Sequence, residues 1–162
     1  MLFRSAEIAG LEWADVTDAM NGVGRVVDGD KYFEVPGAIA KKGRGRVIPM
    51  HPALVAALEL LRTTMRPQFS RGREKVVRGA HARAMTSGAI QKYVGRIYTR
   101  LGLDGCSSHS GRRSFITAMT RTANNYGCSM RDAQLLAGHA HLSSTQPYVD
   151  PSHNVAAMVR GI

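Results

Sequence analysis

The 162-residue sequence is poor in cysteine, in aromatic residues and in acidic residues. Its two cysteines, Cys106 and Cys128, stand far apart and form no C-x-x-C pair, so a disulfide framework or a cysteine-based zinc site is not expected. No stretch approaches the roughly 18 consecutive apolar residues that suggest a membrane span. Residues 1–10 lack the apolar centre of a signal peptide. These absences favour a cytoplasmic protein that folds as one domain around its own apolar core.

Acidic residues are scarcest in the middle of the chain. Residues 1–40 hold three basic and seven acidic side chains, residues 41–100 hold fourteen and two, and residues 101–162 hold five and three. The formal net charge of the whole chain is +10. A basic middle segment is typical of proteins that bind nucleic acid, although a solvated basic surface without a specific partner has the same composition.

The apolar pattern predicts a mainly α domain with a small antiparallel β-sheet near its start, an α+β fold. We expect a helix over residues 4–12 and strands over residues 32–35 and 46–50. The glycine-broken basic segment Lys41–Gly45 is then a hairpin turn between the two strands. Pro36 predicts that the first strand lies at a sheet edge or a bulge.

After Pro52 the periodicity becomes helical, with residues 66–83 as a loop. We expect a helix capped by Ser87, a helix over residues 110–124, a helix from Ser129 to Gly138, and a short helix that begins at Ser143 or Ser144 and carries Tyr148. A last apolar segment spans residues 155–159. The residues predicted to face inward are Leu54, Leu58, Leu61, Ile90, Val94, Ile97, Leu101, Phe115, Ala118, Met119 and Thr122.

Three local features carry possible chemistry, and each is weak alone. The i,i+3 spacing of His109 and Arg112 puts both side chains on one helical face, where they can grip two oxygens of one phosphate. His139 follows the helix-ending Gly138, and Tyr148 follows nine residues later. Taken singly, each has an equally good structural explanation. His109 and Arg112 could be a surface pair, His139 could satisfy a loop hydrogen bond, and Tyr148 could lie in the core or at its boundary.

Together these features resemble the carboxy-terminal signature of the tyrosine recombinases of the phage-integrase family. The pattern is H-x-x-R, then L-x-G-H, then a tyrosine nine residues on. The segment from Arg4 to Asp15 is similar to the family's first arginine box, R-x-x-E-[IL]-x-x-L-x-W-x-D. The segment from Lys41 to Met50 resembles the β-hairpin that presents the family's catalytic lysine. Four boxes in the same order cover nearly the whole chain.

The resemblance implies the fold of a tyrosine recombinase catalytic domain and a role for each matching residue. Tyr148 is then the nucleophile that forms a 3′-phosphotyrosine with DNA during site-specific recombination or integration. Lys41 is the general acid, with Lys42 as the alternative if the loop is shifted by one residue. Glu7 supports the arginine box. The residues implied to bind the scissile phosphate are Arg4, His109, Arg112 and His139.

The implied partner is double-stranded DNA, on which family members act as tetramers at paired sites, and the implied source is a bacterium or a phage. No cofactor and no metal are expected. Histidines such as His139 and His141 lack the cysteine and carboxylate pattern usual for a metal site. We expect further DNA contacts from basic residues of the middle segment, or a solvated loop at the later ones. These residues are Lys42, Arg44, Arg46, Arg71, Arg73, Lys75 and Arg78.

The start of the chain departs from the family. Arg4 stands three residues after Met1, whereas relatives have earlier catalytic-domain helices and a core-binding domain before this arginine. We therefore expect residues 1–162 to be a single catalytic domain without these parts, with Arg4 loosely held and Ile8 and Leu11 partly uncovered. Two alternatives stay open: a non-autonomous DNA-binding or regulatory remnant, and a relative of the type IB topoisomerases.

Overall fold

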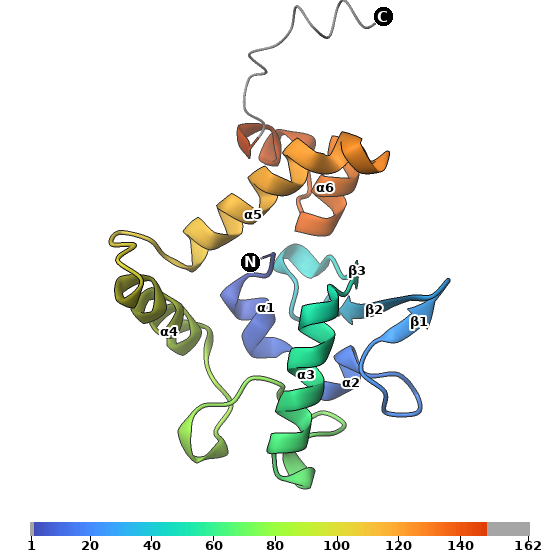
Figure 1. Cartoon of the computed structure of the whole chain (residues 1–162), viewed down its shortest axis with the longest axis vertical. Helices are drawn as coiled ribbons and strands as arrows, with labels where there is room; N and C mark the ends of the chain where they lie inside the picture. Colours follow the sequence, from blue (N-terminus) through green and yellow to red (C-terminus); the bar gives the residue numbers. More distant parts are fainter. Residues whose placement is uncertain (1, 149–162) are drawn as a thin grey trace, which may run out of the picture.

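The computed structural model describes residues 2–148 (Figure 1), so the predicted segment 155–159 lies outside the described residues. Helices form most of the regular structure, and a three-stranded sheet lies near the start. No helix of residues 2–148 is long and apolar enough to cross a membrane. The helices are α1 Ser5–Gly10, α2 Trp13–Val16, α3 Pro52–Thr64, α4 Ser87–Arg100, α5 Ser108–Thr122 and α6 Met130–Ala137. The strands are β1 Arg25–Val27, β2 Asp30–Val35 and β3 Arg46–Pro49.

The two predicted strands are confirmed, but the edge or bulge position that Pro36 predicted for the first of them is not. β2 pairs antiparallel with both β1 and β3, so it is the central strand. Pro36 follows Val35, the last paired residue, and its missing N–H therefore lies outside the ladder. The prediction of an edge strand was wrong for this reason. β1 was not predicted, because its three residues are all exposed and carry no apolar alternation.

Side-chain caps fix the starts of the longer helices. His51 precedes Pro52 and accepts a hydrogen bond from the Ala53 amide at the start of α3. Thr86, and not Ser87 as predicted, caps α4 by accepting from the Ala89 amide. Ser129 caps α6 as predicted, and Gly138 ends it at φ +64°, in the left-handed region.

The core lies between the sheet, α2 and α3. Trp13, Val35 and Ile48 are almost fully buried there, and Leu58 of α3 packs against them with Leu54 and Leu61 at its side, as the sequence predicts. Leu11 is also buried, so the expectation that it is uncovered was wrong.

The inward face of α5 differs from the prediction. Its buried residues are Arg112 and Ile116, whereas Phe115 is 42% exposed and Ala118 and Thr122 are exposed. Apolar periodicity fails here because a buried arginine occupies the face. In α4, Ile90 is buried but Ile97 is exposed, and so is Leu101, which follows the helix.

The arrangement of these elements brings the N-terminal segment close to α5 and α6. In Figure 1, α5 and α6 form the upper part of the view, and the sheet, α2 and α3 form the lower part. The N-terminal segment and α1 lie between the two parts. The connection from β2 to β3 (cyan) reaches toward α6, and it contains the 3₁₀ turn Lys41–Gly43. Residues from four separate sequence regions therefore meet at one place.

Candidate active site

Arg4 immediately precedes α1 and is held by Glu7, one turn later. The Arg4 amide donates to Glu7 Oε2 over 2.9 Å, and Arg4 Nη1 donates to Glu7 Oε1 over 3.1 Å. The Arg4 side chain keeps 25% exposure while that of Glu7 is fully buried. Arg4 thus has a defined partner and an open side, and the structure does not show the loosely held arginine that was expected.

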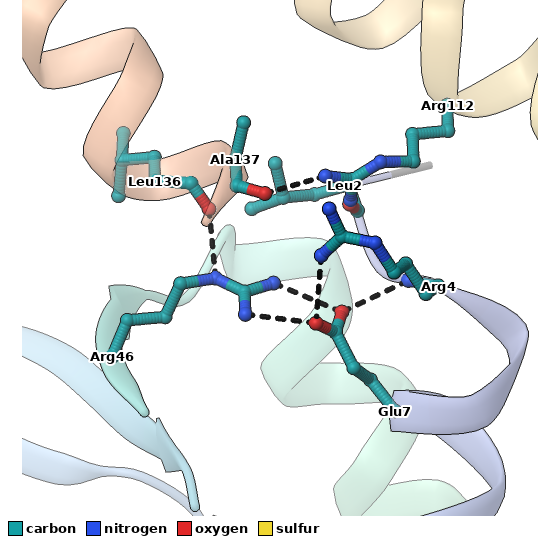
Figure 2. Close-up of polar contacts among 7 residues, drawn as sticks. All are labelled: Leu2, Arg4, Glu7, Arg46, Arg112, Leu136 and Ala137. Atoms are coloured by element: carbon teal, nitrogen blue, oxygen red, sulfur yellow. Dashed lines mark hydrogen bonds and ion pairs between the residues drawn. The ribbon is translucent and has the colours of Figure 1, made fainter. Parts of the chain in front are cut away.

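Glu7 is also bound by Arg46 from β3. Arg46 Nη1 and Nη2 donate to the two carboxylate oxygens, each over 2.9 Å, in a bidentate ion pair (Figure 2). Burial alone raises the pKa of the Glu7 carboxyl, but the hydrogen bonds from Arg46 and Arg4 outweigh it and hold the pKa below its usual value. Arg46 is 8% exposed, so it lies inside this cluster instead of projecting toward DNA as predicted.

Arg112 of α5 comes to the same cluster from the opposite side. Its guanidinium donates to the carbonyl oxygens of Leu2 and Ala137, which joins the first residues to the end of α6 (Figure 2). Burial and the nearby charge of Arg4 lower the pKa of Arg112 to about 10. The side chain therefore still carries its positive charge at neutral pH.

His139 and Tyr148 complete the cluster. Their rings stack with centroids 5.9 Å apart and planes inclined by 26°. Burial, Arg112, Arg4 and Arg46 together lower the pKa of His139 to about 4, which keeps its imidazole neutral near pH 7. Tyr148 belongs to the second of two short 3₁₀ turns, Leu142–Ser144 and Gln146–Tyr148, where a short helix was predicted.

Two residues that support His139 were missed by the sequence analysis. The hydroxyl of fully buried Thr145 lies 2.9 Å from His139 Nδ1. Buried Gln134 donates from Nε2 to the His139 carbonyl over 3.0 Å. The sequence signal that could have found them is their position close to the L-x-G-H and tyrosine motifs. Gln134 stands four residues before Gly138, and Thr145 stands three residues before Tyr148.

Arg4 contributes to the lining of two hollows. One, of about 100 Å³, is lined by Arg4, Lys41, Lys42, Arg44 and His139, together with Gly138, Ala140 and Ser144. The other, of about 170 Å³, is lined by Arg4, His109 and Arg112, together with Phe3, Ser5, Gln91 and Ser108. Five of the six predicted catalytic residues line these hollows, and Tyr148 is the exception. Lys41, Lys42, Arg44 and His109 are exposed.

The remaining predicted DNA contacts lie away from this cluster. Arg71 and Arg73 are exposed in the segment that follows α3, at the opposite end of that helix from α6 (Figure 1). Lys75 Nζ donates to the Gly10 carbonyl over 2.8 Å and pairs with Glu12 over 2.9 Å, so it ties this segment to the end of α1. Arg78 likewise pairs with Glu74. Within residues 2–148, no group of three or more histidine, cysteine or carboxylate side chains is placed to hold a metal ion.

Comparison with known proteins finds relatives named tyrosine recombinase XerC. The chain is 34% identical over 109 residues to tyrosine recombinase XerC of Rhizobium meliloti, covering 67% of this chain and 33% of the relative. It is 29% identical over 146 residues to tyrosine recombinase XerC of Mesorhizobium japonicum, covering 90% of this chain and 41% of the relative. The chain therefore spans between a third and two fifths of the length of these relatives.

Solved structures show the same fold. The XerA recombinase superimposes with a TM-score of 0.66 at 20% identity, over 98% of this chain and 51% of the other. The XerH site-specific recombinase bound to its difH substrate superimposes with a TM-score of 0.71 at 17% identity, over 99% of this chain and 44% of the other. The model of the phage integrase family matches residues 1–154. The match to this family model over most of the chain shows that the chain belongs to the phage integrase family.

Proposed function

We propose that this chain cleaves and rejoins DNA strands in site-specific recombination or integration, with Tyr148 as the nucleophile. The observation that carries the proposal is the Tyr148 ring, which stacks on His139, a residue that lines one hollow with Arg4 and Lys41. A free phenol has a pKa of about 10 and attacks poorly at neutral pH. Cationic neighbours stabilise its anion and make it a better nucleophile. The names of the relatives and of the superimposed DNA complex support the same reaction.

In the first step, the Tyr148 oxygen attacks a DNA phosphorus and releases its proton to solvent water as the new P–O bond forms. Negative charge builds on the non-bridging oxygens, where Arg4 and Arg112 stabilise it. Arg112 is already fixed by two carbonyl oxygens and Arg4 by Glu7, so little reorganisation is needed when DNA arrives. His109 faces the hollow that both arginines line and adds a further hydrogen bond to the phosphate.

His139 acts in this step as a neutral hydrogen-bond donor. Its lowered pKa favours the uncharged ring. If the Thr145 hydroxyl donates to Nδ1, the proton of the imidazole lies on Nε2, which then donates to a phosphate oxygen. Thr145 thereby selects the useful tautomer.

Lys41 completes the step by protonating the leaving 5′-oxygen as the P–O5′ bond breaks. It lines the same hollow as Arg4 and His139, from the exposed turn between β2 and β3. The product is a 3′-phosphotyrosine and a free 5′-hydroxyl. Because the phosphodiester energy is conserved, a 5′-hydroxyl of another strand reverses the reaction and joins new partners without a metal or a nucleotide cofactor.

The proposed partner is double-stranded DNA, held through its phosphates around the hollows. Lys42 and Arg44 line the same hollow as Lys41 and are placed to contact the phosphates there. A contact from Arg71 or Arg73 would lie at the far end of α3, away from the hollows. Assembly into a homotetramer on paired sites, and action in the cytoplasm of a bacterial cell, belong to the same proposal. Selection between integration, excision and resolution depends on the DNA sites.

A covalent trap with randomised duplexes tests the proposal for any target sequence. The chain is incubated with a pool of duplexes that carry a randomised centre and a nick in one strand, which lets the cleaved end diffuse away. We expect an adduct that survives denaturing electrophoresis and disappears in Tyr148→Phe. An undiminished adduct in Tyr148→Phe contradicts the assignment. DNA binding without any adduct supports the alternative of a non-cleaving remnant, and relaxation of supercoiled DNA regardless of sequence supports a topoisomerase.

A further inference from the structure

Arg46 makes three side-chain hydrogen bonds within the site, although it lines neither of the two hollows beside Arg4. Three of its nitrogen atoms are each engaged. Nη1 and Nη2 hold the two oxygens of Glu7, and Nε donates to the Leu136 carbonyl over 2.9 Å. Arg46 starts β3 and pairs with Val35, which is fully buried. Its backbone is therefore fixed by the sheet and its side chain by two other elements (Figure 2).

The first of these elements is α1 with Arg4. Both oxygens of the fully buried Glu7 carboxylate accept from Arg46 and from Arg4. A carboxylate that is held at both oxygens by a rigid fork has one orientation. Glu7 therefore transmits the position of Arg46 to the amide and the guanidinium of Arg4.

The second element is the end of α6. Leu136 O accepts from Arg46, and the neighbouring Ala137 O accepts from Arg112. Gly138 follows, and a Cβ atom there would lie 3.0 Å from Arg46 Nη1 and 3.2 Å from Arg46 Cζ. The guanidinium thus packs directly on the turn that carries His139. A displacement of Arg46 would move that turn as well as Arg4.

We propose that Arg46 is a positioning residue that sets Arg4, through Glu7, and His139, through the end of α6, on the same phosphate. This inference rests on the proposed function. It replaces the DNA contact predicted for Arg46 with an indirect role. It also explains why an arginine is needed, because a lysine would keep the charge but could not hold both Glu7 oxygens and Leu136 O at once.

Single-turnover cleavage at saturating protein tests the proposal on a duplex recovered from the covalent trap. We expect Arg46→Lys to slow cleavage about 10- to 100-fold, the usual effect of losing a residue that orients a site, while the DNA dissociation constant changes less than about threefold. Because Arg46 acts partly through Arg4, the same change in an Arg4→Ala background should cost less than it does in the parent, and the part that remains reports the route through His139.

Ile48→Ala is the matched control for lost stability. Ile48 is buried on the same strand and contacts the core, so its truncation lowers the melting temperature through a cavity. Measured well below the melting temperature of both variants, Ile48→Ala should cleave at the parental rate. The proposal is overturned if Arg46→Lys cleaves like the parent, if Ile48→Ala loses as much rate, or if the losses from Arg46→Lys and Arg4→Ala multiply.

Nuclear magnetic resonance gives a readout that does not depend on cleavage. In the DNA-free protein, Arg46→Lys should shift the Nε–Hε signal of Arg4 and the ring signals of His139, and Ile48→Ala should leave both in place. If the signals shift but the chain forms no adduct, the missing adduct contradicts the proposed function, while the shifts still support the positioning role of Arg46. Unmoved Arg4 and His139 signals in Arg46→Lys would refute the positioning role whatever the chain cleaves.

Discussion

At the scale of single residues, His139 makes folding sensitive to pH. Its pKa falls from 6.5 to about 4 on folding, through burial and three arginines. Between these values the unfolded chain binds a proton that the folded chain does not, so the free energy of unfolding rises with pH across this window and is lost as pH falls.

The measurement is the free energy of unfolding of His139→Gln and of the parent at pH 7 and pH 4.5. The parent should lose about 1–2 kcal/mol more than His139→Gln between the two pH values, an amount reduced from the full shift by partial exposure. His141→Gln is the control, because His141 is exposed two residues away. Equal losses in His139→Gln and the parent would contradict a depressed pKa.

The same scale decides between the two hairpin lysines. Lys41 and Lys42 are both exposed and line one hollow, and Lys42 has a left-handed backbone with φ +62°. A general acid contributes about 10²- to 10⁴-fold to the rate, and a substrate whose leaving oxygen is replaced by sulphur needs no such acid. Lys41→Ala should therefore cleave the normal duplex slowly and the sulphur-substituted duplex at the parental rate. Sulphur rescue confined to Lys42→Ala would assign the role to Lys42 instead.

The residues that the sequence could assign are those whose motif partners lie close along the chain. His109 and Arg112 are three residues apart, and His139 and Tyr148 are nine apart. The burial of Arg46 was not predicted because its partner Glu7 lies 39 residues away, and within a basic run a buried arginine cannot be distinguished from a surface one. Charge patterning reports on sign but not on burial, and burial decides the role of this side chain.

At the scale of elements, the end of α6 depends on Gly138 in two ways. Its φ of +64° disfavours a side chain, and Arg46 occupies the space of a Cβ atom. Gly127 offers a matched control, because its φ is +66° and nothing lies within 4 Å of its Cβ position. Gly127→Ala should cost about 1–2 kcal/mol from backbone strain alone. Gly138→Ala should cost at least about 1 kcal/mol more, because Arg46 cannot yield without breaking its bonds to Glu7.

Chemical denaturation of the two variants measures this difference. Cleavage assays add a second comparison, in which Gly138→Ala should be impaired and Gly127→Ala should not. Equal losses of stability in the two variants would show that the contact with Arg46 contributes nothing.

Elements were predictable where apolar spacing and caps agree. The predictions of α3 and α6 agree closely with the structure. Leucines recur at helical spacing around Leu58 in α3, and Ser129 and Gly138 mark the two ends of α6. The central position of β2 could not be predicted, because it depends on pairing with β1, and β1 has no buried residue that would show an apolar pattern in the sequence. The inward face of α5 was misread because Arg112 is buried by contacts to residues 2 and 137, which are distant in sequence.

At the scale of the whole molecule, charge is the property that governs DNA binding. The excess of twelve positive charges in residues 41–100 releases counterions when it meets phosphates. We expect weak binding whose logarithm falls against the logarithm of salt concentration with a slope of about −5 to −9, since each neutralised phosphate contributes about −0.9.

Titrations at several salt concentrations measure this slope. The double variant Lys42→Gln with Arg44→Gln should make it shallower by about 1.8, as two phosphate contacts predict. Arg25→Gln is the control, because Arg25 lies on β1 and pairs with Glu34 at the surface. Affinity that hardly changes with salt would contradict binding through the phosphate backbone.

The central claim is that Tyr148 becomes covalently linked to DNA. Its most direct test is mass spectrometry of the protease-digested adduct from the covalent trap. We predict one modified peptide, with a nucleotide joined through its 3′-phosphate to the Tyr148 oxygen, and a free 5′-hydroxyl on the released strand. A nucleotide on any other residue, or a 5′-phosphate on the linked DNA end, would contradict the account.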